Sequence, residues 1–200
     1  MPIDQPSWIS KAAIACVGAL LTISSGCVPF ATLTDYTPEM PGGTLIVGNC
    51  LGTRRIHYSV DGVSIRSGLL VYPHARKNMP HISLAFAIPD GRTVELVSAE
   101  IALVYAPATA TTRIRIAGLG TTKAPGQFLD PLAPMVGGDR RVGERVFPHD
   151  FSTNIPLTED PTGDIRAELP DIKINGRVFK IPPIDFRRTP RVEWMTPINC

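Results

Sequence analysis

The chain has 200 residues, of which 44% are hydrophobic and 19% charged, and its formal net charge is +2. These proportions are ordinary for a folded protein and exclude disorder throughout the chain, while so small a net charge gives no indication of a nucleic-acid partner. Proline accounts for 20 residues. Because proline breaks helix interiors, this content favours short strands and loops over long helices.

The first predicted element is an export signal. Residues 12–23, AAIACVGALLTI, are apolar or small and uncharged; Lys11 precedes them and the small residues of the SSGC segment at 24–27 follow. A weakly basic start, a short apolar run and small residues are typical of a signal peptide. The run is too short for a transmembrane helix, which needs about 20 apolar residues. We therefore expect residues 1–26 to be removed.

This opening resembles that of bacterial lipoprotein precursors, over residues 1–27 only. In that class a small residue precedes a cysteine that is acylated and becomes the mature N-terminus, and Gly26 and Cys27 match these positions. The resemblance implies lipidation of Cys27, with palmitate-type chains that hold the protein to a membrane. The usual aliphatic residue three positions before the cysteine is Ser24 here, so ordinary cleavage after Gly26 remains an alternative. Val28 replaces the Asp that retains enteric lipoproteins in the inner membrane.

The resemblance therefore implies an outer-membrane lipoprotein in the cell envelope, facing the periplasm. The alternative location is soluble, periplasmic or secreted. Cys16 leaves with the signal and Cys27 carries lipid, so Cys50 and Cys200 remain in an oxidising compartment where disulfides persist. We predict a disulfide between Cys50 and Cys200, with two free thiols or pairing to another chain as alternatives.

Residues 28–43, VPFATLTDYTPEMPGG, contain three prolines and show no clear periodicity. They indicate a tether between the anchor and the domain. The predicted organisation is thus a signal peptide over residues 1–26, a lipidated cysteine and tether over 27–43, and a single β-rich domain over 44–200.

Within that domain the sequence predicts strands joined by tight turns. Residues 56–60 and 63–67 alternate around Asp61-Gly62, and a two-residue loop pairs Val60 with Val63 and Tyr58 with Ile65. A second hairpin is predicted for residues 82–88 and 94–96. There a three-residue Pro-Asp-Gly loop, with Gly91 left-handed, sets Phe86 opposite Val94.

Further strands are predicted at residues 101–105, 114–116 and 191–195, and a hairpin at 172–181 around Asn175-Gly176. Residues 118–164 are rich in glycine and proline, and we expect a long irregular excursion there. The predicted fold class is all-β: an antiparallel β-sandwich or a partly open barrel with that excursion.

No catalytic motif is evident, because neither Gly-x-Ser-x-Gly nor Ser-x-x-Lys occurs. His74, His81 and His149 are weak candidates for a metal site, since zinc needs three or four ligands in a closed geometry and none of these forms a close pair. We assign no catalytic residue, no metal and no cofactor, and we predict that the domain is not an enzyme.

These observations favour an envelope-anchored lipoprotein with a non-enzymatic β-domain that binds a protein or another envelope component. One alternative is an immunity or inhibitor-type lipoprotein that blocks a toxic enzyme, with the 118–164 excursion as the blocking element. Another is a metal-dependent hydrolase that uses His74, His81 and His149. The expected partners are the membrane, through the lipid anchor, and a protein in the envelope, and no nucleic acid.

The anchor can be tested directly by mass spectrometry of the mature N-terminus. We expect the first residue to be Cys27 carrying acyl chains, because Gly26 and Cys27 occupy the cleavage and acylation positions. An unmodified Cys27 would indicate ordinary signal cleavage, and an intact Met1 would contradict export.

Overall fold

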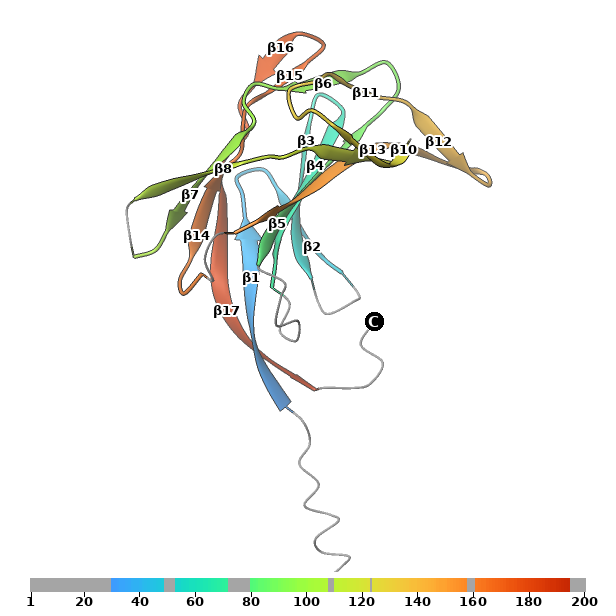
Figure 1. Cartoon of the computed structure of the whole chain (residues 1–200). Coiled ribbons are helices and arrows are strands. Elements are labelled where there is room, and N and C mark those ends of the chain that lie inside the picture. The colour runs from blue at the N-terminus through green and yellow to red at the C-terminus, as the bar shows by residue number, and fades with distance from the viewer. Residues whose placement is uncertain are drawn as a thin grey trace, which may run out of the picture.

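The computed structural model describes residues 30–48, 53–71, 80–107, 110–122, 124–157 and 161–194. These ranges fold into strands and turns (Figure 1) and contain no helix that is long and apolar enough to cross a membrane. The predicted all-β antiparallel class is confirmed. The strands are β1 (Phe30–Glu39), β2 (Thr44–Val47), β3 (Arg54–Val60), β4 (Val63–Leu70), β5 (His81–Ile88), β6 (Thr93–Leu96), β7 (Glu100–Tyr105), β8 (Thr111–Arg115), β9 (Leu119–Thr121), β10 (Ala124–Leu129), β11 (Met135–Val136), β12 (Asp139–Val142), β13 (Arg145–Pro156), β14 (Ile165–Glu168), β15 (Ile172–Ile174), β16 (Arg177–Phe179) and β17 (Ile184–Trp194).

The first of three open antiparallel sheets has the order β1-β17-β14-β7-β8. Its longest pairing joins β1 to β17 over ten residues, from Phe30 opposite Trp194 to Glu39 opposite Asp185. Tyr36 of β1 is only 1% exposed, and its hydroxyl donates a 2.8 Å hydrogen bond to the Pro161 carbonyl. The tether prediction is therefore wrong for residues 30–43, because alternate side chains of β1 enter the core.

The second sheet has the order β10-β9-β13-β5-β4-β3-β2, and β12 pairs with β13 outside this path. The β3–β4 hairpin has the predicted register, with Val60 opposite Val63 and Tyr58 opposite Ile65. Asp61 and Gly62 have φ values of 46° and 80°. Two successive positive φ angles are those of a type I′ turn, whose twist matches that of the strands it joins.

The predicted pairing of residues 82–88 with 94–96 is wrong. Gly91 is left-handed as expected, with a φ of 75°. However, β5 is bordered by β4 on one side and β13 on the other. Because both of its edges are occupied, β6 cannot pair with it, and the turn at 89–91 instead passes the chain into the third sheet.

That third sheet has the order β11-β6-β15-β16. Its β15–β16 hairpin turns at Asn175-Gly176 as predicted, with Ile172 opposite Phe179. The strand predicted at 101–105 is confirmed, and that predicted at 114–116 ends at Arg115; the two strands pair with Ile101 opposite Ile114. The last strand begins at Ile184 rather than Arg191.

The irregular excursion expected over residues 118–164 is also wrong, because this segment contains β9 to β13. β13 is the longest strand, with 12 residues. Phe151 and Ile155 alternate there with exposed Ser152 and Asn154, which is the period of a half-buried strand. The prolines at 148 and 156 hid this pattern in the sequence.

Side chains from all three sheets form one apolar core. It includes Ile65 and Phe86 of the second sheet, Leu103 and Phe186 of the first, and Ile172 of the third. Cys27, Cys50, Cys200 and His74 lie outside the described residues.

Leu84 in the central strand β5 is fully buried. We expect Leu84→Ala to lower the free energy of unfolding by about 2–5 kcal/mol, because the lost methyl groups leave a cavity. Denaturant unfolding measures this change, with Val178→Ala, at a 53% exposed position, as the control. Equal stability of the two variants would contradict this description of the core.

Candidate functional site

One exposed element is a two-stranded arm, residues 139–148, formed by β12 and the first part of β13. In Figure 1 it projects from the second sheet. Among the described strands, β12 pairs only with β13, from Asp139 opposite Pro148 to Val142 opposite Arg145. Gly143 and Glu144 form its tip, and Gly143 has a φ of 61°. A two-residue loop with a left-handed glycine first is a hairpin turn of type II′.

Arginine and apolar side chains share both faces of the arm. Directly opposed residues of a hairpin lie on the same face, and all side chains from residue 139 to 147 are exposed. Val142 is 54% exposed and Val146 is 52% exposed. An isolated two-stranded hairpin is marginally stable in water, so a partner that covers this arm would increase the stability of the hairpin. One face carries Arg140, Val142, Arg145 and Phe147, and the other carries Asp139, Arg141, Val146 and Pro148.

The base of the arm is fixed by close packing at a glycine pair. A Cβ added to Gly137 would lie 2.0 Å from the Pro89 carbonyl oxygen, and one added to Gly138 would lie 2.6 Å from the His149 ring. The His149 amide also donates a 2.8 Å hydrogen bond to the Gly138 carbonyl. The arm therefore leaves the domain from a defined position.

Beside the arm lies an open groove of about 460 Å³, bounded by β9, β10 and β13. Phe128 is 75% exposed in it. The other lining side chains bear hydroxyl or amide groups, except for Arg140 and two glycines. The groove is lined by Gly120, Thr121, Thr122, Gly126, Gln127, Phe128, Arg140, Ser152, Thr153 and Asn154.

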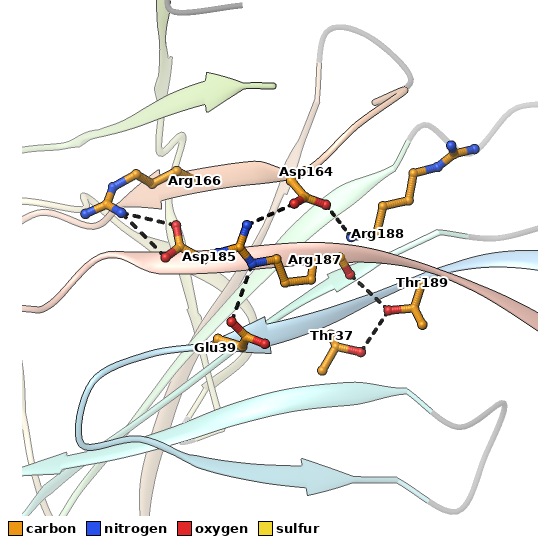
Figure 2. A network of polar contacts seen from close by, with 8 residues as sticks. All are labelled: Thr37, Glu39, Asp164, Arg166, Asp185, Arg187, Arg188 and Thr189. Carbon is orange, nitrogen blue, oxygen red and sulfur yellow. Dashed lines mark hydrogen bonds and ion pairs between the residues drawn. The ribbon is translucent and has the colours of Figure 1, made fainter. Parts of the chain in front are cut away.

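The first sheet carries a separate network of charged side chains, which Figure 2 shows. Arg187 of β17 lies between two carboxylates: its Nε is 3.4 Å from Glu39 Oε2 and its Nη1 is 3.0 Å from Asp164 Oδ2. Arg166 of β14 pairs with Asp185 of β17 at 3.3 Å. These contacts cross β1, β17 and the start of β14, so their role is to join strands.

Asp164 accepts a second hydrogen bond of 2.8 Å from the Arg188 backbone N–H. This bond, followed by that from the Arg187 guanidinium, lowers the pKa of Asp164 below its usual value. Hydrogen bonds to Asp164 and Glu39 raise the pKa of Arg187. Asp164 and Arg187 therefore each stabilise the charged form of the other. A shallow depression of about 190 Å³ lies beside them, and every charged side chain among its described lining residues is paired.

A polar face of the second sheet brings a serine and a histidine together. Ser64 Oγ lies 2.6 Å from His57 Nε2. A catalytic triad needs a carboxylate on the other ring nitrogen, and the described residues place none there. Close to this pair, the side chain of Arg66 crosses β5, and its Nη2 lies 2.6 Å from Asp150 Oδ1. The small side chain of Ala85, opposite Arg66, leaves room for this crossing.

The histidines considered as metal ligands do not converge where they are described. His81 lies at the start of β5, and His149 is paired with Ile88 at its end. Seven residue positions separate them along the strand, roughly 23 Å. Within the described residues, no three His, Cys, Asp or Glu side chains are grouped so that they could hold a metal ion.

The sequence analysis missed the arm and the groove because both lie in the segment expected to be irregular. The alternation of Phe151 and Ile155 with Ser152 and Asn154 is the signal that could have revealed β13. No local signal places Phe128 beside Arg140, since they lie on strands that do not pair with each other.

Comparisons with protein-family models, with curated protein sequences and with solved structures found no match to this chain.

The lowered pKa of Asp164 predicts how stability depends on pH. A carboxyl group with a folded-state pKa below its unfolded value of about 3.9 stabilises the fold fully above that value, and this contribution is lost as the pH falls through the folded-state pKa. We expect wild type to be more stable than Asp164→Asn at pH 7 and the difference to shrink below about pH 4.

Thermal unfolding between pH 2 and 7 measures this difference, and Glu168→Gln, at an exposed position of β14, is the matched control. A difference that is absent at pH 7, or that persists unchanged at pH 2, would contradict the role given to Asp164.

Proposed function

We propose that this protein is an envelope-anchored lipoprotein whose β-domain is not an enzyme and binds a protein partner through the arm at residues 139–148. The observation that carries the proposal is the exposure of arginine and apolar side chains on both faces of that arm. Arginine and phenylalanine are enriched in protein interfaces, and the outer edge of β12 has no paired strand among the described residues.

Charged residues on an edge strand also serve to prevent unwanted pairing, and Arg140 and Arg141 have that effect whatever else they do. The exposed Val142, Val146 and Phe147 are what favour a partner. Solvated valine and phenylalanine side chains contribute nothing to the core. Removing their apolar surface from water contributes about 25 cal/mol for each Å², which works against the entropy cost of association.

The arm lies far from the end of β1 that is next to the proposed anchor. This position supports a partner that binds on the side of the domain facing away from the membrane. Cys27 is three residues before Phe30, where β1 begins, so an acylated Cys27 lies within about 10 Å of that strand end. In Figure 1, β1 begins at the bottom of the molecule, whereas β12 lies at the upper right. A lipid-held domain would thus present the arm away from the bilayer.

Inhibition of a toxic enzyme is a second candidate function, favoured by the narrow shape of the same arm. A two-stranded element that is exposed on both faces can enter the concave site of an enzyme. This version and the first differ only in the identity of the partner: an incoming hydrolase in one case and a resident envelope protein in the other.

Site-specific photo-crosslinking in living cells tests the proposal. We expect a photoreactive amino acid in place of Phe147 to give one reproducible protein adduct. The double substitution Arg141→Glu and Arg145→Glu should reduce that adduct about tenfold, because it replaces an arginine by a carboxylate on each face of the arm. Sequencing the captured protein separates the inhibitor from the resident-partner version.

The matched control places the same photoreactive residue at Val178, which is exposed on the third sheet. An equal yield of the same adduct at positions 147 and 178, or no change on charge reversal, would refute the arm as the binding element.

A further inference from the structure

The groove beside the arm differs in its chemistry from the arm, and its central feature is the ring of Phe128. Phe128 lies opposite Gly120 in the β9–β10 pairing. A Cβ added to Gly120 would lie 3.6 Å from Phe128 Cε1, and one added to Gly118 would lie 3.8 Å from Cδ1. The ring therefore rests on backbone that has no side chain to interrupt it.

This arrangement leaves one side of an aromatic ring supported and the remainder exposed. Phe128 is 75% exposed, the largest value among the exposed large hydrophobic side chains of the described residues. An aromatic side chain loses little conformational entropy on binding because it has only two side-chain torsions. Supported from below, it forms a flat platform for a ligand that has an apolar face.

Three of the neutral polar side chains around the platform are available to a ligand. The side chains of Gln127, Ser152 and Asn154 line the groove and make no hydrogen bond within the described part of the protein. Amide and hydroxyl groups can both donate and accept hydrogen bonds. Arg140 is the only charged side chain among the described lining residues, and its guanidinium offers donors alone.

We propose that this groove binds a carbohydrate chain. A pyranose ring has an apolar C–H face, which stacks on an aromatic ring, and an edge of hydroxyl groups, each of which both donates and accepts hydrogen bonds. Phe128 supplies the first requirement, and Gln127, Ser152 and Asn154 supply the second. A purely apolar ligand would leave these amide and hydroxyl groups without partners, at a cost of roughly 1–3 kcal/mol for each buried group.

The size and charge of the groove agree with such a ligand. Its volume of about 460 Å³ is within the usual range for small-ligand sites and accommodates one or two sugar rings of a longer chain. Among the described residues that line it, Arg140 is the one cation and none is a carboxylate, so neutral sugars and sugars that carry carboxylate or phosphate groups are both acceptable. A nucleic-acid strand would require a longer basic track.

Two envelope sources share this chemistry: the glycan strands of the cell wall and the oligosaccharide of lipopolysaccharide. The choice of an envelope glycan rests on the proposed location, whereas the choice of a carbohydrate rests on the groove alone. Titration calorimetry of the mature protein in detergent micelles, against solubilised cell-wall glycan strands and separately against lipopolysaccharide core oligosaccharide, distinguishes the two sources.

We expect one of these two probes to bind, and Phe128→Ala to weaken its binding about tenfold through loss of the stacked ring. Val178→Ala is the control, because it removes an exposed apolar side chain from the third sheet and leaves the groove lining intact; it should leave the dissociation constant unchanged. If Phe128→Ala does not fold, Asn154→Ala, at an exposed position, is expected to give a weakening of several-fold.

Binding of neither probe, or binding that is insensitive to both groove variants, overturns the proposal. Photo-crosslinking at Phe147 remains the separate readout for the arm. An arm adduct without glycan binding would support protein binding by the arm and refute glycan binding by the groove. Glycan binding without an arm adduct would support the groove proposal and refute the arm proposal.

Discussion

The pairing of β13 with β5 is the interaction on which the rest of the structure depends. Eight consecutive residue pairs, from His149 opposite Ile88 to Pro156 opposite His81, hold these strands together across 61 to 75 positions of sequence. This pairing occupies the second edge of β5 and so sends β6 into the third sheet. It also positions the free end of β13, from which the arm extends, and the edge on which β9 docks.

A second long-range pairing, between β1 and β17, joins the two ends of the described chain. Its side chains reach the core on one face, through Tyr36 and Phe186, and form the charged network of Figure 2 on the other. Exposed ion pairs of this kind contribute little each, so the stability of the ribbon rests mainly on buried apolar surface. The network instead keeps the charges of neighbouring strands matched.

The arm and the groove present two different kinds of surface within one small region. The arm offers arginine, valine and phenylalanine without a supporting face, which suits a partner that covers it. The groove offers a supported aromatic ring among neutral hydrogen-bonding groups, which suits a ligand that enters it. Arg140 belongs to both, since it lies on β12 and lines the groove. Occupation of one is therefore expected to alter the charge environment of the other.

The sequence by itself determined the all-β class and the hairpins that turn at Asp61-Gly62 and Asn175-Gly176. In these hairpins a two-residue loop with positive φ angles fixes the register of the strands that it joins, so local chemistry is sufficient. Only the tertiary structure decided the neighbours of β5, β1 and β13, and with them the arm and the groove. Pairing between distant strands depends on which sheet edge is still available and which faces can share a core. Neither property is contained in the residues of the strand itself. The wrong prediction that residues 82–88 pair with residues 94–96 demonstrates this.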